Sequence, residues 1–242
     1  MGNVLVEFNN ITKIYRKRGF VSTKKVVGVE DLTFEIYENE IFGLLGLNGS
    51  GKTTTIKLLL GLLYSDSGEI KFLGEKCPKW ELNKNIGYLP EIVNFNKRFS
   101  GEELLKFYAD LCGSVTQERF YETVKFVKLE ESIKRKVSEY SKGMVQRLGL
   151  AQALIHNPLF LVLDEPSSGL DPLGIKEIRE LITNLKNNGK TIFFSSHLIS
   201  ELEKICDRVG IIHRGRLVKV VSQKEWENWS LEEIFISTIS NC

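Results

Sequence analysis

The segment from Gly46 to Thr53 has the residue types and the spacing that a phosphate-binding loop requires. It reads Gly-Leu-Asn-Gly-Ser-Gly-Lys-Thr and fits the pattern G-x-x-x-x-G-K-[ST] without a mismatch. An apolar run at 41–45 precedes it and the run 54–60 follows it, in the order strand, loop, helix. Glycines let backbone N–H groups converge on phosphate oxygens, and the N-terminus of the next helix favours the same negative charge. The segment therefore predicts a site for nucleotide phosphates.

Two side chains at the end of this loop have further roles in such a site. Lys52 supplies a positive charge for the β- and γ-phosphates, and the Thr53 hydroxyl can ligate Mg²⁺. Kinases, GTPases and motor ATPases all use loops of this kind, so the loop alone does not distinguish them. The residues predicted to bind nucleotide here are Gly46, Leu47, Asn48, Gly49, Ser50, Gly51, Lys52, Thr53 and Thr54.

A pair of carboxylates, Asp164 and Glu165, directly follows a run of five apolar residues at 159–163. Such a run is typical of a strand buried on both faces of a parallel sheet. Open α/β sheets place their chemistry at the carboxyl ends of strands. We expect Asp164 to hold Mg²⁺ through water and Glu165 to polarise the attacking water as general base. Adjacent acids also occur in ordinary turns, and the phosphate-binding loop is what favours the catalytic interpretation.

The segment 140–144, Tyr-Ser-Lys-Gly-Met, lies upstream of that strand. It resembles the signature of the nucleotide-binding domain of ATP-binding-cassette (ABC) transporters, which is usually Leu-Ser-Gly-Gly-Gln. Ser141 and Gly143 match the signature, and the other three positions depart from it. Ser141 is also suited to cap the following helix, so that its hydroxyl and the helix N-terminus would face a γ-phosphate. The resemblance implies that Ser141 and Gly143 bind ATP.

Shorter segments resemble other parts of the same family. Residues 168–171, Ser-Gly-Leu-Asp, resemble the D-loop, which touches the partner subunit. His197 follows an apolar run and resembles the switch histidine that contacts the γ-phosphate. Tyr15 resembles the aromatic residue that stacks on adenine. The resemblance therefore implies an adenine contact at Tyr15 and a catalytic set formed by Glu165, His197 and Lys52.

One departure from the family concerns the metal ion. Residues 86–90 resemble the lead-in to the Q-loop, but Glu91 follows where a glutamine is usual. In the family, the glutamine carbonyl joins the Mg²⁺ shell and the loop couples to the membrane partner. A carboxylate can also ligate Mg²⁺, so the predicted metal ligands are Thr53, Asp164 and Glu91. The alternative is that Glu91 is a solvated loop acid.

Composition narrows the class of protein. The 33 lysines and arginines and the 31 acidic residues leave a formal net charge of +2, which gives no global attraction to nucleic acid. No apolar run approaches the roughly 18 residues of a membrane helix, and no apolar segment of a signal peptide is seen. The 4 cysteines are dispersed, which argues against a zinc site and for a reducing cytosol. Basic clusters at 16–18, 24–25 and 134–136 are expected in solvated loops.

The order of elements predicts the fold class. Alternating apolar residues at 4–8 and 32–36 indicate antiparallel strands, and residues from about 99 to 146 read as helical. Strand and helix alternate from residue 159 onward, with a hairpin expected around 214–216. We expect an α/β protein with a P-loop NTPase core, an antiparallel β side sheet and a helical signature lobe. The prediction is a single ABC ATPase domain over 1–242, with a helical subdomain inserted at about 86–156.

The resemblance extends over essentially the whole chain and implies a function. It implies a subunit that binds and hydrolyses ATP with Mg²⁺, dimerises on ATP and drives substrate translocation by a separate transmembrane permease. Such a subunit lies at the cytoplasmic face of the membrane through the permease and binds no nucleic acid. The tail at 226–235 resembles that of export-type systems. The alternatives are a soluble ABC ATPase acting on the ribosome or DNA, and a P-loop kinase. The sequence contains no feature that identifies the transported substrate or that decides between a homodimer and a heterodimer.

Overall fold

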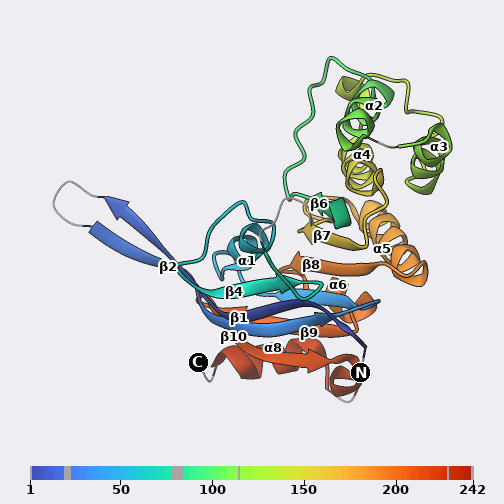
Figure 1. Ribbon diagram of the computed structural model, residues 1–242. Coiled ribbons are helices and arrows are strands. Elements are labelled where there is room, and N and C mark those ends of the chain that lie inside the picture. Colours follow the sequence, from blue (N-terminus) through green and yellow to red (C-terminus); the bar gives the residue numbers. More distant parts are fainter. Residues whose placement is uncertain (1, 19–22, 78–83, 114, 228, 241–242) are drawn as a thin grey trace. The chain divides into compact units, whose positions relative to one another are not determined.

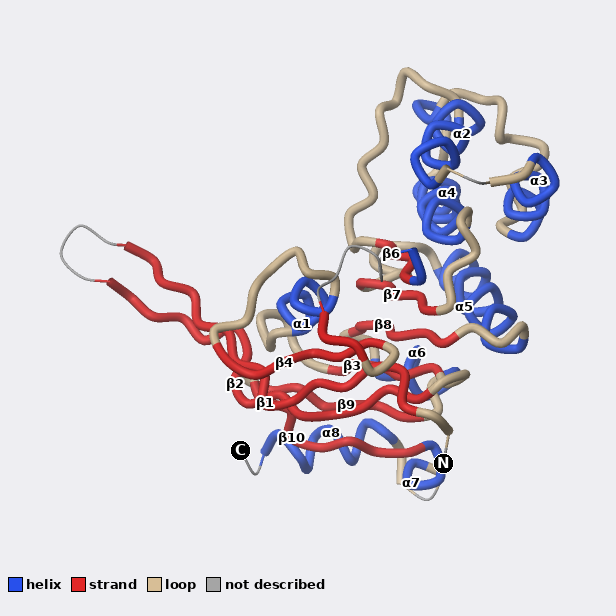
Figure 2. Tube along the Cα trace, viewed as in Figure 1, coloured by secondary structure: helices blue, strands red, loops and turns tan. Residues whose placement is uncertain are grey.

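In the computed structural model, all residues are described except 1, 19–22, 78–83, 114, 228 and 241–242 (Figure 1). The chain divides into two compact units. The first unit comprises residues 1–82 and 193–242, and the second comprises residues 83–192. Each unit mixes strands and helices (Figure 2), so the predicted α/β class is confirmed.

The first unit contains the predicted antiparallel sheet. Its strands have the order β2-β1-β4-β5 and every neighbouring pair is antiparallel. Phe8 of β1 lies opposite Phe34 of β2, and their rings stack with centroids 4.3 Å apart. The alternation of apolar residues thus places one face of each strand in the core. The strands are β1 (Val4–Arg18), β2 (Thr23–Tyr37), β4 (Ser67–Phe72) and β5 (Glu75–Cys77).

Two basic clusters lie on strands, so the prediction that they occupy loops was wrong. Arg16 pairs with Lys25, and Lys17 pairs with Lys24, in the β1–β2 ladder. Figure 1 shows β1 and β2 continuing together past the rest of their sheet. The ladder forms between backbone groups, so basic residue types do not prevent it. The cluster at 134–136 lies in a turn region, as predicted.

The first unit also contains strands of another sheet, which includes both parallel and antiparallel pairs. β9 pairs parallel with β3 and antiparallel with β10, and the C-terminal part of β8 lies next to β3. Arg214 and Gly215 join β9 to β10 with φ values of 48° and 84°, as a type I′ turn requires, which confirms the predicted hairpin. The elements are β3 (Ile41–Leu45), β8 (Thr191–Ser196), β9 (Arg208–His213), β10 (Arg216–Ser222), α1 (Lys52–Leu59), α6 (Ile199–Ile205), α7 (Gln223–Trp226) and α8 (Leu231–Ser240).

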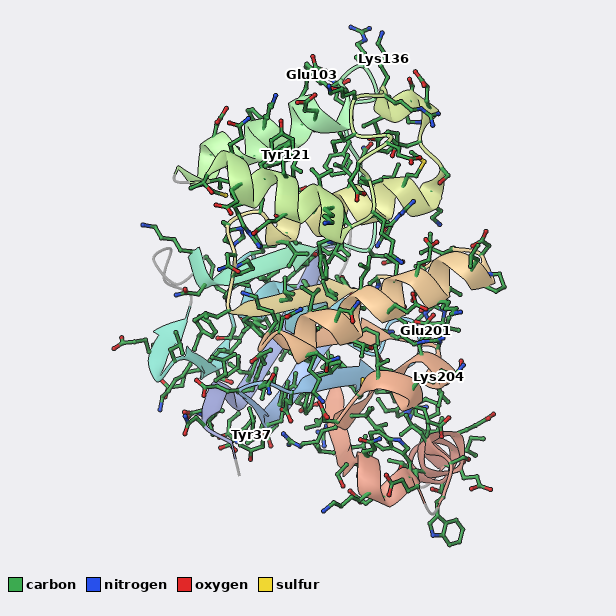
Figure 3. The ribbon with its side chains drawn as sticks, turned by 90° about the vertical axis from the view of Figure 1, so that its right-hand side faces the viewer. Tyr37, Glu103, Tyr121, Lys136, Glu201 and Lys204 are labelled. Carbon is green, nitrogen blue, oxygen red and sulfur yellow. The ribbon has the colours of Figure 1, made fainter. Side chains whose placement is uncertain are left out.

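The second unit is mainly helical. β6 and β7 pair in parallel, and Thr191 at the start of β8 donates to the carbonyl of Leu159. A capping box opens α2, since Ser100 and Glu103 exchange hydrogen bonds there. Figure 3 shows Glu103 and Lys136 at the same end of this helical part. The elements are β6 (Ile86–Leu89), α2 (Gly101–Cys112), α3 (Gln117–Phe126), the 3₁₀ helix η2 (Val137–Glu139), α4 (Lys142–Leu154), β7 (Phe160–Asp164) and α5 (Pro172–Asn187).

α5 is an amphipathic helix. Ile178, Ile182 and Leu185 are buried on one face, and Gly189 follows the helix end with φ 80°. Within the described part of the chain, no helix combines the length and the apolar character needed to cross a membrane.

Candidate nucleotide-binding site

The phosphate-binding loop connects β3 to α1 in the first unit, as its sequence predicted. Every residue of β3 is buried, which anchors the start of the loop in the core. Leu47, Asn48 and Gly49 are exposed, whereas Ser50 and Lys52 are buried. The loop is also anchored to the β9–β10 turn, because the N–H of Gly215 donates to the Ser50 carbonyl at 2.8 Å. The exposed residues therefore face solvent from a fixed base.

Glycine suits three positions of the loop for different structural reasons. A Cβ on Gly46 would collide with the Ser50 hydroxyl and stand only 2.5 Å from the carbonyl oxygen of Ile212. Gly51 caps α1 with φ 115°, where its missing side chain also avoids the Gly28 carbonyl. Gly49 has φ 78° and open space on its Cβ side. The first two are needed for packing, and the third leaves the outer side of the loop free for a ligand.

The polar groups of the loop suit an anionic ligand. The Lys52 ammonium donates to the Gly46 carbonyl at 2.7 Å, and so lies against the loop. The Ser50 hydroxyl is buried and has no hydrogen-bond partner among the described residues. An unpaired buried hydroxyl costs free energy, and a phosphate oxygen would satisfy it. The loop thus offers a charge, an unpaired hydroxyl and a helix N-terminus to a phosphate.

Tyr15 lies beside the phosphate-binding loop in the first unit. Its hydroxyl is 3.2 Å from the Thr54 hydroxyl, one residue after Thr53 of the loop. Its ring rests against Gly28 of β2, since a Cβ there would stand 2.6 Å from Tyr15 Cε2. The structure therefore brings Tyr15 next to the loop across 39 residues of sequence. Sequence reasoning missed Gly28, for which the only signal is a glycine within a strand.

His197 belongs to the first unit and directly follows β8. Its side chain is exposed, whereas the strand before it is buried throughout. The next turn is fixed by Ser196, whose hydroxyl accepts from the Leu198 N–H at 3.0 Å. The histidine is thus presented to solvent at the end of a rigid strand, which is the local setting that its predicted role requires.

The carboxylates of the second unit lie at one edge of a parallel strand pair. Leu89 at the end of β6 is in register with Leu163 of β7, so Glu91 and Asp164 leave the sheet at the same edge. Asp164 is 2% exposed, and Glu91 is exposed. Burial raises the pKa of Tyr88 to about 12, and the charges of Asp164 and Glu91 contribute. Both carboxylates therefore lie close enough to act on the same phenol.

Glu165 has a backbone conformation that is unusual for its residue type. Its φ is 48°, in the left-handed region, and its side chain is only 7% exposed. Non-glycine residues in this region cost about 1–3 kcal/mol and cluster at functional sites. The N–H of Ser168 donates to the Glu165 carbonyl at 3.0 Å and fixes the turn. Asp31 has a similar φ of 52° but is exposed, so the combination of this conformation with burial distinguishes Glu165.

Ser141 caps α4 as predicted. Its hydroxyl accepts from the Met144 N–H at 3.2 Å, and Gly143 has free space on its Cβ side. Ser141 is exposed and Gly143 is half-buried at the start of the helix. The preceding Tyr140 points into the helical part instead, where its hydroxyl donates to the Ser132 carbonyl at 2.8 Å. This anchoring role of Tyr140 was missed from the sequence.

The donor atoms fit Mg²⁺ and ATP. Mg²⁺ binds one or two protein oxygen ligands, substrate phosphates and several waters. The Thr53 hydroxyl and the Asp164 carboxylate are ligands of this kind. Among the described residues, no group of three or more His, Cys, Asp or Glu side chains could hold a metal alone. The oxygen atoms of Thr53, in the first unit, and of Asp164, in the second, are each suited by their chemistry to a Mg²⁺ ion that also binds phosphates.

Comparison with known proteins identifies the family. A family model described as ABC transporter matches residues 29–168. An ABC transporter ATP-binding protein of Nostoc is 44% identical over 219 residues, which are 88% of this chain and 65% of that protein. The YhcH protein of Bacillus subtilis is 41% identical, over 91% of this chain and 71% of YhcH. The bacitracin transport protein BcrA of Bacillus licheniformis is 40% identical, over 90% of this chain and 70% of BcrA. The chain thus spans about two thirds of the length of these relatives.

Solved structures agree with these relatives. The ATP-binding subunit of an ABC transporter superposes with a TM-score of 0.81 at 26% identity, over 97% of this chain and 99% of that chain. A dimeric ATP-binding cassette in a post-hydrolysis state, bound to ADP and Pi, superposes with a TM-score of 0.80 at 25% identity, over 90% of this chain and 99% of that chain. The chain therefore belongs to the ABC transporter family and has the P-loop NTPase fold of its ATP-binding cassettes.

Proposed function

We propose that this chain is the ATP-binding and ATP-hydrolysing subunit of an ABC transporter. It dimerises on ATP, works at the cytoplasmic face of the membrane and drives substrate translocation by a separate transmembrane permease. The observation that carries the proposal is the buried carboxylate pair after β7, with Glu165 in a left-handed conformation. A phosphate-binding loop alone explains binding, whereas this pair supplies the chemistry of hydrolysis.

Each site residue has a proposed role that follows from its setting. Residues 46–54 bind the triphosphate, and Lys52 balances charge on the β- and γ-phosphates. Mg²⁺, when bound, would neutralise charge on those phosphates and would be held by Thr53, Asp164 and Glu91. Glu165 accepts the proton of the attacking water, and His197 contacts the γ-phosphate. Ser141 and Gly143 contact the ATP of the partner subunit, and Tyr15 stacks on adenine.

The helical part offers a surface for the permease. A pocket of about 350 Å³ lies there, and Phe99 and Phe107 at its wall are 46% and 56% exposed. We propose that a cytoplasmic segment of the permease inserts an apolar or aromatic side chain into it, since exposed aromatic residues in a pocket are typical anchors of protein interfaces. We further propose that 86–156 forms an inserted subdomain. The pocket is lined by Asn94, Phe95, Asn96, Phe99, Glu103, Leu104, Phe107 and Tyr108.

The transport role has support from relatives. BcrA proteins of Bacillus licheniformis and Enterococcus faecalis, named for bacitracin transport, are 40% and 37% identical to this chain. We propose that this chain likewise serves a transport system, and that the system is of the export type that the tail at 226–235 resembles. Co-purification of a membrane protein from the native host would test this, and capture only of ribosomes or DNA would contradict it.

The Glu165→Gln variant tests the hydrolytic role. The amide keeps the size of the side chain but accepts a proton poorly, so ATP binding should persist while turnover falls by about 100-fold or more. ATP-bound dimers should then accumulate and be visible by size-exclusion chromatography with light scattering. Turnover within about twofold of wild type would remove Glu165 from this role.

Mixed dimers test the shared site. Lys52→Ala and Ser141→Arg should each inactivate a homodimer, because both of its sites are damaged. A mixed dimer would contain one site with both lesions and one intact site, so mixing should restore ATPase activity. A site contained within one chain predicts no rescue. A mixed dimer of wild type and a subunit carrying both substitutions is the converse control. Each of its shared sites contains one lesion, so it should stay inactive, whereas a site contained within one chain predicts activity from the wild-type subunit.

A further inference from the structure

Lys142 and Gly169 meet within the second unit. Lys142 is the first residue of α4, after the capping residue Ser141, and Gly169 lies in the loop 168–171 that precedes α5. A Cβ on Gly169 would collide with the ammonium nitrogen of Lys142 and stand 3.3 Å from its Cε. The end of the lysine side chain therefore lies against the backbone of this loop, although 27 positions separate the two residues (169 minus 142).

The lysine is not placed there by an ordinary surface interaction. It is exposed, and it forms no hydrogen bond or ion pair with any other residue that the structure describes. The first turn of α4 contains no acidic residue, and a cation at a helix N-terminus is unfavourable to the helix dipole. Neither pairing nor helix stability thus explains the charge. The approach to Gly169 is the contact that the structure shows for the end of this side chain.

We propose that Lys142 is a positioning residue that joins the start of α4 to the loop 168–171. The proposal rests on the proposed function, in which Ser141 and this loop both face a second copy of the chain. Two segments that meet one partner surface must keep a fixed separation, because small misplacements at a composite site cost rate. The lysine side chain provides that connection within the subunit, and Gly169 leaves room for it.

The glycine permits a test that separates this role from backbone strain. Gly169 has φ 66°, so alanine is strained there in any case. The added methyl would meet only the far end of a flexible side chain, which can move away, so the protein should still fold. Gly189 is a matched control, because it has φ 80° in the same unit and nothing lies within 4 Å of its Cβ position. Gly169→Ala and Gly189→Ala should therefore lose similar thermal stability.

The experiment is a double-mutant cycle on the full chain. Lys142→Ala and Gly169→Ala should each lower ATPase kcat by about three- to tenfold, and the double variant should be no worse than either one. The Kd for ADP should stay within about twofold of wild type in all variants. Gly189→Ala should leave kcat unchanged. Multiplying effects in the double variant, or equal effects of the two glycine substitutions, would overturn the proposal.

Hydrogen exchange gives a readout that does not depend on activity. The amides of Ser168 and Leu170 donate to Glu165 and Ser167 within the loop. Their exchange should accelerate in Lys142→Ala and Gly169→Ala, and stay as in wild type in Gly189→Ala. Unchanged exchange in Lys142→Ala would overturn the proposal. An inactive wild type with the expected exchange pattern would instead refute the proposed function alone.

Discussion

The proposed adenine contact of Tyr15 can be tested through Gly28, which lies against the ring of Tyr15. The ring of Tyr15 rests against Gly28, and its hydroxyl bonds Thr54 beside the phosphate-binding loop. Stacking of a base on an aromatic ring is worth about 1–3 kcal/mol. Tyr15→Ala should therefore weaken nucleotide binding by about 5- to 140-fold at 1.4 kcal/mol per factor of ten. Tyr15→Phe keeps the ring and should cost less than about threefold.

Gly28→Ala should act on the same contact indirectly. The new Cβ would stand 2.6 Å from Tyr15 Cε2, whereas carbon atoms pack at about 3.5–4.0 Å. The ring must therefore move by about 1 Å, and the stacked base must move with it or lose contact. We expect a loss of affinity of at least about threefold, and no larger than that of Tyr15→Ala. In the Tyr15→Ala background, Gly28→Ala should have no further effect.

Calorimetric titration with ADP measures these effects without turnover. Competition by inorganic pyrophosphate provides the control, because it reports the phosphate-binding loop and should be unchanged in every Tyr15 and Gly28 variant. Equal losses in Tyr15→Ala and Tyr15→Phe would assign the effect to the hydroxyl. Independent losses for Gly28→Ala and Tyr15→Ala would refute the reasoning that Gly28 acts through the ring.

Two further predictions concern stability. Burial lowers the pKa of His156, with Arg119 and Lys190 contributing, so the folded state resists its protonation. Its contribution to stability is full above about pH 6.5 and is lost as the pH falls, and His156→Gln should flatten the fall in melting temperature between about pH 7 and 5. Ser100→Ala removes a capping box and should cost about 1–2 kcal/mol in urea unfolding, more than Thr116→Ala, which removes a simple cap. An equal cost for both caps would contradict the second prediction.

The parts of the site that the sequence predicted are those whose geometry is set by neighbouring residues. The loop 46–53 curls because its own glycines permit it, and Ser141 caps the helix that begins at the next residue. The strand before Asp164 is buried because five consecutive residues are apolar. In each case the chemistry and the backbone conformation are contained in fewer than about ten residues, so a pattern is enough to find them.

The parts that the sequence did not predict depend on distant pairings. The basic residues at 16–18 and 24–25 lie on strands because the ladder that begins at Val4 continues to Arg18. Gly28 matters only because register places it beside the ring of Tyr15. Tyr140 anchors to Ser132 through a hydrogen bond that no local pattern encodes. Residue type alone did not indicate these contacts, because the fold determines which distant residue each one meets.

The same distinction bears on how this chain departs from its family. A substitution within a local motif, such as Glu91 for glutamine, replaces the atom that is proposed to ligate Mg²⁺, so its chemical effect can be predicted from the motif alone. Lys142 also stands within a local motif, yet its contact is with Gly169 in another segment. Its effect therefore cannot be judged from the signature alone, since it depends on whether residue 169 leaves room for it. In a relative with a lysine at this position and a larger residue in place of the glycine, the lysine should be displaced from the loop.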